Sequence, residues 1–460
     1  MKRTLFASVL LCAASVAAVP AGAAVDLSLK RLYSLPWVVG TTPESPAWSP
    51  DSRRVAFLWN DDGGNTRDLW WTDTTGHGPI RLTDVRRKPD PAIGDPDAAR
   101  QDLARREADP GITAFAWLED GQALAYCRSG RLYRMQATPN SRAIEIDPDA
   151  RAAHEPVGLP HSPAVLYAHH RGLSRHDPAT GPTLLASVPD DVSIDTLTVS
   201  PDGRFVAFIE TDLRSIAERI IPDYLTTETS APKIRRAFPG EPSERFRIGV
   251  VRTSGGPVVW MKAGGDAQDP VFSLAWSADS KTLLVDRGDL YIKHRWIRLL
   301  DPDNGEGRTV LEERDEANVT AEWWSAFAPD GRSVYTVSDR GSDYQLWQIP
   351  LDGTPAKQLT PDGYAVFGAS VVASADGVMF IANRDAAEDR TPYWLDARGV
   401  ISALADSHGH HEPVASPDGR WLADIHSDDR TPPELYLRPL HPAGTGPQED
   451  RKSTRLNSSH

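Results

Sequence analysis

Residues 200–208 read SPDGRFVAF, and the turn at the start of this stretch recurs along the chain. In SPDG the proline holds φ at about −65°, the aspartate bonds its own backbone, and the glycine accepts the left-handed conformation that closes a bulged hairpin. The residues after the turn alternate as the two faces of a β-strand do. Related turns begin at Ser49 (SPDS), Leu118 (LEDG), Ser277 (SADS), Ala328 (APDG), Ser374 (SADG) and Ser416 (SPDG), with a degenerate copy, LPHS, at Leu159.

Each turn belongs to a repeated unit of about four strands. After the first turn, a second hairpin is predicted from DLWWTD at 68–73 and PIRLTD at 79–84. The turns start 69, 41, 41, 77, 51, 46 and 42 residues apart. A four-stranded unit of this period cannot bury both faces alone, so copies stack radially into a β-propeller. We expect an all-β chain of eight blades, with seven as the alternative, and a strand near Leu32–Val39 that completes the last blade.

The two longest spacings indicate insertions. One covers 86–111, is charged, and contains a short predicted helix near Ala98–Glu107. The other, 213–246, is an arm inserted in the fourth blade. Such insertions project from a propeller and are where contacts with partners are usually made.

The N-terminus is typical of an export signal. Lys2 and Arg3 precede an apolar run too short to cross a bilayer, and small residues follow it as far as Ala24. We expect residues 1–24 to be a signal peptide and the protein to be periplasmic or secreted. Cys127 is then the only cysteine of the mature chain, which excludes an intramolecular disulfide.

The charge of the chain argues against nucleic-acid partners. The formal net charge is −14, and removing Lys2 and Arg3 makes it −16. An acidic protein repels nucleic acids and anionic membrane surfaces. After the predicted signal peptide, no apolar stretch is long enough for a membrane span.

Around the arm the sequence resembles the N-terminal propeller of dipeptidyl peptidase IV and its bacterial relatives. SPDGRFVAFIETD (200–212) leads into the arm, and KIRRAFPGEPSERFRIGVVRTSGG (233–256) returns from it, with 237–240 standing for the family's Tyr-Pro-Lys-Ala-Gly-like segment. The segments 286–319 and 328–353 continue the match, which spans roughly Val25–Leu437. The resemblance implies an eight-bladed propeller that lies over an α/β-hydrolase domain and filters peptides into it. Many members remove N-terminal dipeptides.

The catalytic signature of such a hydrolase does not occur in this sequence. Serine acyl transfer on that fold uses a Gly-x-Ser-x-Gly elbow, and the nearest match, Gly172–Leu173–Ser174, continues with Arg-His. We therefore assign no catalytic residue, expect no cofactor, and expect the chain alone to be inactive. His408, His410 and His411 precede the last turn without a partner helix that carries carboxylates at the spacing of metal ligands, so no metal is expected.

Asp190 and Asp191 are the candidate binding residues. In the family, two adjacent glutamates just upstream of this blade's hairpin grip the substrate's ammonium group. Two carboxylates suit that task, since an ammonium has three donors. Asp190 and Asp191 lie in roughly the same place. The alternative is a solvated loop between blades.

The last residues differ from the rest of the chain. DRKSTRLNSSH (450–460) is basic and serine-rich, and it resembles a translated sequencing-library adapter. We therefore expect a signal peptide at 1–24, a propeller at 25–440, a linker at 441–449 leading towards a hydrolase domain, and an artefactual tail at 450–460.

Two functions remain open. The first is the non-catalytic propeller of an exported serine peptidase, with peptides as substrates of the full-length enzyme and a homodimer formed through the arm at 213–246. Its Ser-Asp-His triad would lie in the hydrolase domain. The second is a free-standing periplasmic propeller that binds a protein partner. The long arm favours the first.

Overall fold

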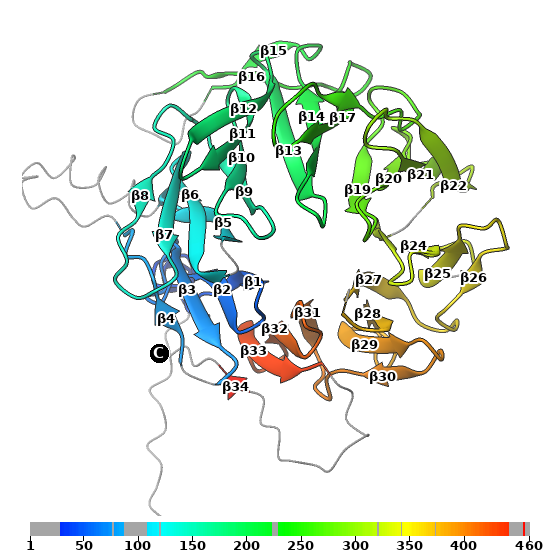
Figure 1. Cartoon of the computed structure of the whole chain (residues 1–460). Coiled ribbons are helices and arrows are strands. Elements are labelled where there is room, and N and C mark those ends of the chain that lie inside the picture. Colours follow the sequence, from blue (N-terminus) through cyan, green and yellow to red (C-terminus); the bar gives the residue numbers. More distant parts are fainter. Residues whose placement is uncertain are drawn as a thin grey trace, which may run out of the picture.

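The chain forms a ring of eight antiparallel sheets. A computed structural model describes residues 28–75, 78–86, 108–118, 121–222, 229–319, 322–341, 343–372, 374–440 and the strand at 454–455. In this part of the chain each of the eight blades has four strands (Figure 1). The expected all-β propeller of eight blades is confirmed, and the seven-bladed alternative is wrong. The predicted signal peptide, the linker at 441–449 and the predicted helix near Ala98–Glu107 lie outside the described residues.

The first four blades run from β1 to β18. Blade 1 comprises β1 (Glu44–Trp48), β2 (Arg54–Trp59), β3 (Asp68–Asp73) and β4 (Ile80–Arg81). Blade 2 comprises β5 (Ile112–Leu118), β6 (Ala123–Arg128), β7 (Arg131–Gln136) and β8 (Ile144–Glu145). Blade 3 comprises β9 (His154–Gly158), β10 (Val165–His169), β11 (Gly172–Asp177) and β12 (Gly181–Ser187). Blade 4 comprises β13 (Val192–Val199), β14 (Phe205–Asp212), β17 (Arg245–Arg252) and β18 (Val259–Trp260).

The remaining blades follow the same order. Blade 5 comprises β19 (Val271–Trp276), β20 (Leu283–Gly288), β21 (His294–Leu300) and β22 (Gly307–Arg314). Blade 6 comprises β23 (Ser325–Phe327), β24 (Ser333–Ser338), β25 (Gln345–Pro350) and β26 (Lys357–Gln358). Blade 7 comprises β27 (Val366–Val371), β28 (Gly377–Ala382), β29 (Thr391–Asp396) and β30 (Ile401–Ala403). Blade 8 comprises β31 (His410–Ala415), β32 (Trp421–Ser427), β33 (Glu434–Pro439) and β34 (Thr454–Arg455).

The repeated turn closes through the same hydrogen bonds in several blades. In blade 4 the Ser200 hydroxyl donates to Asp202 at 2.7 Å and accepts from the Phe205 amide at 3.0 Å. Gly203 has a φ of 72°, which explains the glycine at this position. Ser49, Ser277 and Ser416 make the equivalent pair of bonds in blades 1, 5 and 8. The serine and aspartate of the motif therefore satisfy backbone and side-chain groups that the tight turn leaves without strand partners.

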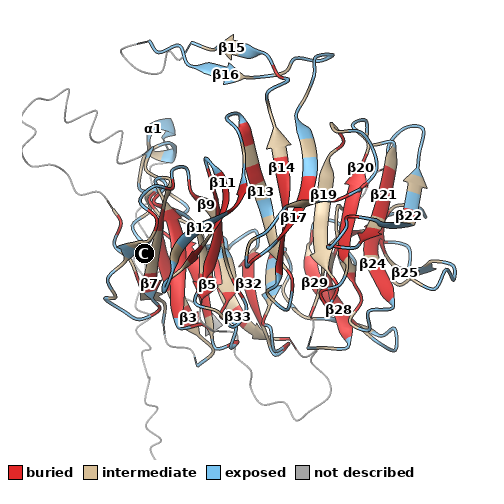
Figure 2. Cartoon of the chain, turned by 45° about the horizontal axis from the view of Figure 1, so that its top comes forward, coloured by how far each residue is buried: buried red, intermediate tan, exposed pale blue. Residues whose placement is uncertain are grey.

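The core lies between neighbouring blades. The second strands are almost wholly buried, the third strands are buried in part, and the first strands are partly exposed (Figure 2). Phe205 and Ala207 of β14, for example, pack with Leu283 and Val285 of β20. Each blade thus covers the apolar face of the next, as the repeat period predicts.

The ring does not close through the strand expected near Leu32–Val39. That segment contains a single helical turn, α1 (Leu29–Leu32), and no strand. Pro36 lies within it and has no N–H for a sheet ladder. The fourth strand of blade 8 is β34, in which Thr454 pairs with Leu437 of β33; it lies within the stretch 450–460 that the sequence led us to expect as an artefactual tail. Blades 1 and 8 instead join through side chains, and their shared cluster includes Trp48, Phe57, Ala423 and Leu435.

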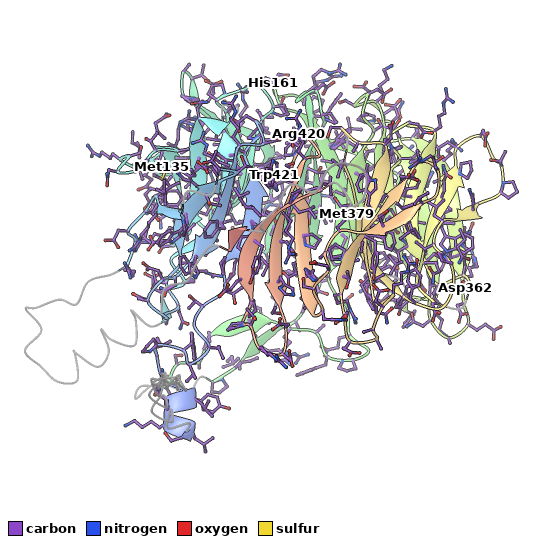
Figure 3. The ribbon with its side chains drawn as sticks, turned by 90° about the horizontal axis from the view of Figure 1, so that it is seen from below. Met135, His161, Asp362, Met379, Arg420 and Trp421 are labelled. Carbon is purple, nitrogen blue, oxygen red and sulfur yellow. The ribbon has the colours of Figure 1, made fainter. Side chains whose placement is uncertain are left out.

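The arm projects from blade 4, as expected. Its described part contains the hairpin of β15 (Glu218–Ile220) and β16 (Lys233–Arg235) between β14 and β17. In Figure 3 this hairpin and α1 lie at the opposite end of the ring from the turns that carry His161 and Arg420. We call the end with the arm and α1 the arm face, and the other end the turn face.

Candidate functional site

The expected amine-binding pair lies on the arm face, at the foot of the arm. Asp190 and Asp191 form the loop between β12 and β13, and both are exposed. The Asp191 carboxylate accepts a hydrogen bond from Arg235 of β16 at 2.7 Å, and this bond raises the pKa of Arg235. The Leu213 amide also donates to the Asp191 carbonyl at 3.0 Å. Asp191 therefore joins the arm to blade 4, and Asp190 is its exposed neighbour.

Three arginines surround a hollow of about 550 Å³ beside this loop. Arg245 and Arg247 lie two residues apart on β17, and Arg214 follows β14. We call this the arginine hollow; Asp212, Ser215 and Ala267 complete its lining. The arginine hollow was not predicted from the sequence. The available signal was the alternation in Arg245–Phe246–Arg247, which places both arginines on one face of a strand.

Two of these arginines are held by carboxylates from β14. Arg214 donates to Asp212 through two nitrogens, at 2.9 and 2.7 Å, and this pairing is the main cause that lowers the pKa of Asp212 to about 2. Arg247 donates to Glu210 at 2.9 Å, and its guanidinium lies 3.9 Å from the centre of the Trp260 ring. These two side chains are therefore fixed in place.

A second hollow on blade 5 has the opposite charge. Its volume is about 400 Å³, and Asp266, Asp289, His294, Trp296 and Glu312 are among its lining residues. His294 is 2.9 Å from a Glu312 oxygen. Within the described chain, no group of three or more His, Cys, Asp or Glu side chains has an arrangement that could hold a metal ion.

Large exposed apolar side chains gather on the arm face. They come from α1 and the segment after it, from the arm, and from the loop between β20 and β21. They are Leu29, Leu32, Tyr33, Val39, Ile220, Ile234, Phe238, Leu290 and Tyr291. Tyr33 is 81% exposed and Tyr291 is 75% exposed. The turn face carries the repeated polar turns instead. Exposed apolar side chains that gather on one face mark a candidate interaction site.

Ser174 belongs to the segment whose sequence is most similar to a Gly-x-Ser-x-Gly elbow, but its side chain is buried. Its hydroxyl is 2.8 Å from Nε2 of His169. Burial lowers the pKa of His169 to about 4, and the Arg171 amide donates to its Nδ1 at 3.4 Å. A neutral ring that accepts at Nδ1 carries its proton on Nε2. His169 then donates to Ser174 and has no lone pair with which to activate the hydroxyl.

The three histidines before the last turn have separate partners. His408 contacts Asp389 at 2.7 Å, His410 contacts Glu412 at 3.3 Å, and His411 contacts Asp424 at 2.8 Å. Nε2 of His411 is closer to the Ser407 carbonyl oxygen (3.2 Å) than to its hydroxyl oxygen (3.5 Å). The His411 side chain is fully buried. The contact of His408 with Asp389 joins the segment before β31, the first strand of blade 8, to the loop before β29 of blade 7, whereas the other two carboxylate contacts lie within blade 8.

No helix in the described ranges combines the length and apolar character that crossing a membrane requires.

Solved structures of two bacterial peptidases share this architecture. Porphyromonas gingivalis dipeptidyl peptidase 4 superposes with a TM-score of 0.67 at 12% identity, covering 87% of this chain and 59% of its own. A candidate dipeptidyl aminopeptidase IV of Bacteroides ovatus gives a TM-score of 0.60 at 14% identity, covering 91% of this chain and 60% of its own. At these identities the likeness shows the fold alone. The chain spans about 60% of the length of these proteins.

Sequence comparison gives the family. An uncharacterized protein of Agrobacterium fabrum is 30% identical over 111 residues, which cover 22% of this chain and 38% of that protein. The family model of the dipeptidyl peptidase IV (DPP IV) N-terminal region matches residues 195–433, just over half of the chain. The match includes the arm, the arginine hollow and blades 5 to 7. The chain therefore belongs to the family of dipeptidyl peptidase IV N-terminal regions.

Proposed function

We propose that the chain is the non-catalytic propeller of an exported serine peptidase and that it admits and recognises peptide substrates. The observation that carries this proposal is the gathering of exposed apolar side chains, including Tyr33, Phe238 and Tyr291, on the arm face. Family membership supports an α/β-hydrolase domain as the occupant of that surface. Burying these side chains against a second domain removes apolar area from water and so stabilises the assembly.

The genomic sequence downstream of codon 449 tests this proposal. We expect an in-frame hydrolase segment with a Gly-x-Ser-x-Gly elbow, followed by the Asp and His of a triad. In the complete enzyme, Tyr33→Lys and Tyr291→Lys should weaken domain association, measured as earlier release of the hydrolase domain in limited proteolysis. A matched lysine on the turn face, Asp376→Lys, should leave the proteolysis rate unchanged. A stop codon directly after the propeller would contradict the proposal.

Recognition of the peptide's amino group is assigned to Asp190 and Asp191. Both carboxylates lie at the foot of the arm, and Asp191 shares its charge with Arg235. An ammonium ion would have to compete for Asp191 or bind at the exposed Asp190. Isothermal titration of the full chain with a tetrapeptide and its N-acetylated form should show weaker binding of the acetylated one. Asp190→Asn should remove that difference, whereas Asp376→Asn should preserve it. Equal affinity for the two peptides would rule out amine recognition.

The arm is proposed to pair subunits. Ile220 and Ile234 are exposed on a two-stranded hairpin that extends away from the ring (Figure 2). The free edges of such a hairpin can pair with a second copy. Light scattering should give a dimer for the complete enzyme and a monomer for Ile220→Lys. A dimer unchanged by this substitution would place the interface elsewhere.

The same apolar surface also favours a second candidate, a free-standing periplasmic propeller that binds a protein partner. The two candidates differ in the gene segment downstream of the propeller, so its sequence separates them. Export is common to both. N-terminal sequencing of the mature protein should begin at about Val25 if a signal peptidase acts at the small residues before it.

A further inference from the structure

The arginine hollow has an excess of positive charge within an acidic protein. Arg214, Arg245 and Arg247 line it, and the carboxylates that contact them are Asp212 and Glu210. Three cations and two anions leave a local charge of +1, against a formal charge of −14 for the chain. Asp212 and Glu210 offset two of the three guanidinium charges, so one positive charge is left to attract an anion.

Arg245 is the member of the set whose side chain has no direct partner. This side chain is exposed and makes no hydrogen bond or ion pair in the described ranges; its charge acts on Asp212 only at longer range, where it helps to lower the pKa of that carboxyl. Its position on β17 is set by the ladder, because Arg245 pairs with Asp212 across the strands. A guanidinium has five N–H donors in a fixed fork, so this residue can bind an incoming anion without first breaking an existing contact.

The neighbours of Arg245 prepare the hollow for a planar anion. Arg214 is held by two bonds to Asp212, and Arg247 is fixed between Glu210 and the Trp260 ring. Because Arg214 and Arg247 are already ordered, only Arg245 loses rotamer freedom when a ligand binds. The volume of about 550 Å³ accommodates a side chain or a chain end rather than a lone ion.

We propose that the arginine hollow binds a carboxylate group of a peptide, through Arg245, at the foot of the arm. The carboxylate is either the peptide's C-terminus or an acidic side chain, both of which match the guanidinium fork with two parallel hydrogen bonds. This proposal rests on the proposed role in peptide recognition and adds a preference for acidic or short substrates.

A small dicarboxylate tests the anion site without involving a peptide. Glutarate, titrated calorimetrically into the full chain, should bind, and Arg245→Gln should weaken it at least tenfold, since a charge-assisted pair is lost. Arg245→Lys should retain part of the affinity. Arg252→Gln, at the other end of the same strand, is the matched control and should change nothing. Glutarate binding that is unaffected by Arg245→Gln, or a site that takes inorganic phosphate but not glutarate, would overturn the proposal.

Peptides then distinguish the two sources of the carboxylate. Ala-Ala-Glu-Ala is compared with its C-terminal amide and with Ala-Ala-Gln-Ala, each titrated into the full chain and into Arg245→Gln. One of the two neutral peptides should bind the unmodified chain about tenfold more weakly than Ala-Ala-Glu-Ala does. The same neutral peptide should bind Arg245→Gln as tightly as Ala-Ala-Glu-Ala does, because the variant has already lost the carboxylate contact. Peptide binding indifferent to both carboxylates would reject the anion site while leaving peptide recognition intact. Glutarate binding without peptide binding would reject peptide recognition.

Discussion

Trp48 and Val414 close the ring: the indole Nε1 of Trp48, at the end of β1, donates a 2.8 Å hydrogen bond to the Val414 carbonyl of β31. The same bond recurs within the ring. Trp117 donates to Ala47, one blade back, at 2.9 Å, and Trp276 donates to Thr198 at 3.1 Å. Each of these tryptophans directly precedes a repeated turn. The contact between the first and last blades is thus an ordinary contact between neighbouring blades, made by residues 366 apart.

Replacing Trp48 with Phe should weaken this closure. The substitution removes the donor and with it the hydrogen bond between the two blades, and should cost about 0.5–1.5 kcal/mol in the free energy of unfolding, measured in urea. Trp71→Phe is the matched control, because the Trp71 Nε1 is buried without a partner among the described residues. The urea midpoint of Trp71→Phe should fall by less than that of Trp48→Phe. Equal losses in the two variants would show that the hydrogen bond contributes nothing.

His154 should make stability fall in the alkaline range. It lies 3.3 Å from Asp195 in the next blade, and this contact is the main cause that raises the pKa of His154 to about 9. The stability that the pair contributes is fully present below about pH 6.5, the pKa of a histidine in the unfolded chain. It is lost as the pH rises through about 9, the pKa of His154 in the folded protein. Because His154 is partly exposed, we expect only about 1 kcal/mol.

Urea unfolding at pH 6.5 and at pH 9.5 measures this loss. The loss should disappear in His154→Gln and persist in His410→Gln, which alters an exposed histidine on blade 8. An equally steep decline in His154→Gln would assign the alkaline sensitivity to other groups.

Arg295 should be among the least replaceable charged residues. Its guanidinium is fully buried, bonds to Asp286 at 2.9 and 2.6 Å, and reaches the Val337 carbonyl of blade 6 at 2.8 Å. Arg295→Met leaves the buried Asp286 carboxylate with the Ser325 hydroxyl but without a counter-charge, at a cost of about 3–5 kcal/mol in unfolding free energy. The double variant Arg295→Met, Asp286→Leu should recover part of it. Arg314→Met breaks an exposed, solvent-screened pair and should cost much less than Arg295→Met. If Arg295→Met lost no more unfolding free energy than Arg314→Met, this account would be contradicted.

Cys127 should resist thiol reagents in the folded protein. The side chain is buried in β6, and burial raises the pKa of its thiol to about 12, so little thiolate exists at pH 8. Peptide mass spectrometry after iodoacetamide treatment should find Cys127 unmodified until urea is added. A cysteine introduced at the exposed Asp376 should be labelled under native conditions. Comparable native labelling at both positions would mean that blade 2 opens readily.

The repeated turn made the blades predictable. The serine, aspartate and glycine of SPDG at 200–203 act within a few residues of one another, so their pattern reports a local structure directly. The spacing of the turns predicted the number of blades and the blade that carries the arm. The pair Asp190–Asp191 was located by resemblance, and its assignment to the substrate amine stays a prediction. Its link to Arg235 could not be foreseen, because 44 residues separate Asp191 from that arginine.

By itself the sequence determined the local unit, which is a set of four strands that begins with one turn and is repeated eight times. That unit depends on the φ preferences of the turn residues, on hydrogen bonds within the turn, and on the alternation of side chains between the two faces of a strand. Only the tertiary structure decided how the ring closes and which charges meet at the foot of the arm. Trp48 and Val414, or Arg214 and Arg245, come together only when blades stack and strands pair across long loops. Contacts of that kind depend on the packing of the whole ring, and short-range pattern does not encode them.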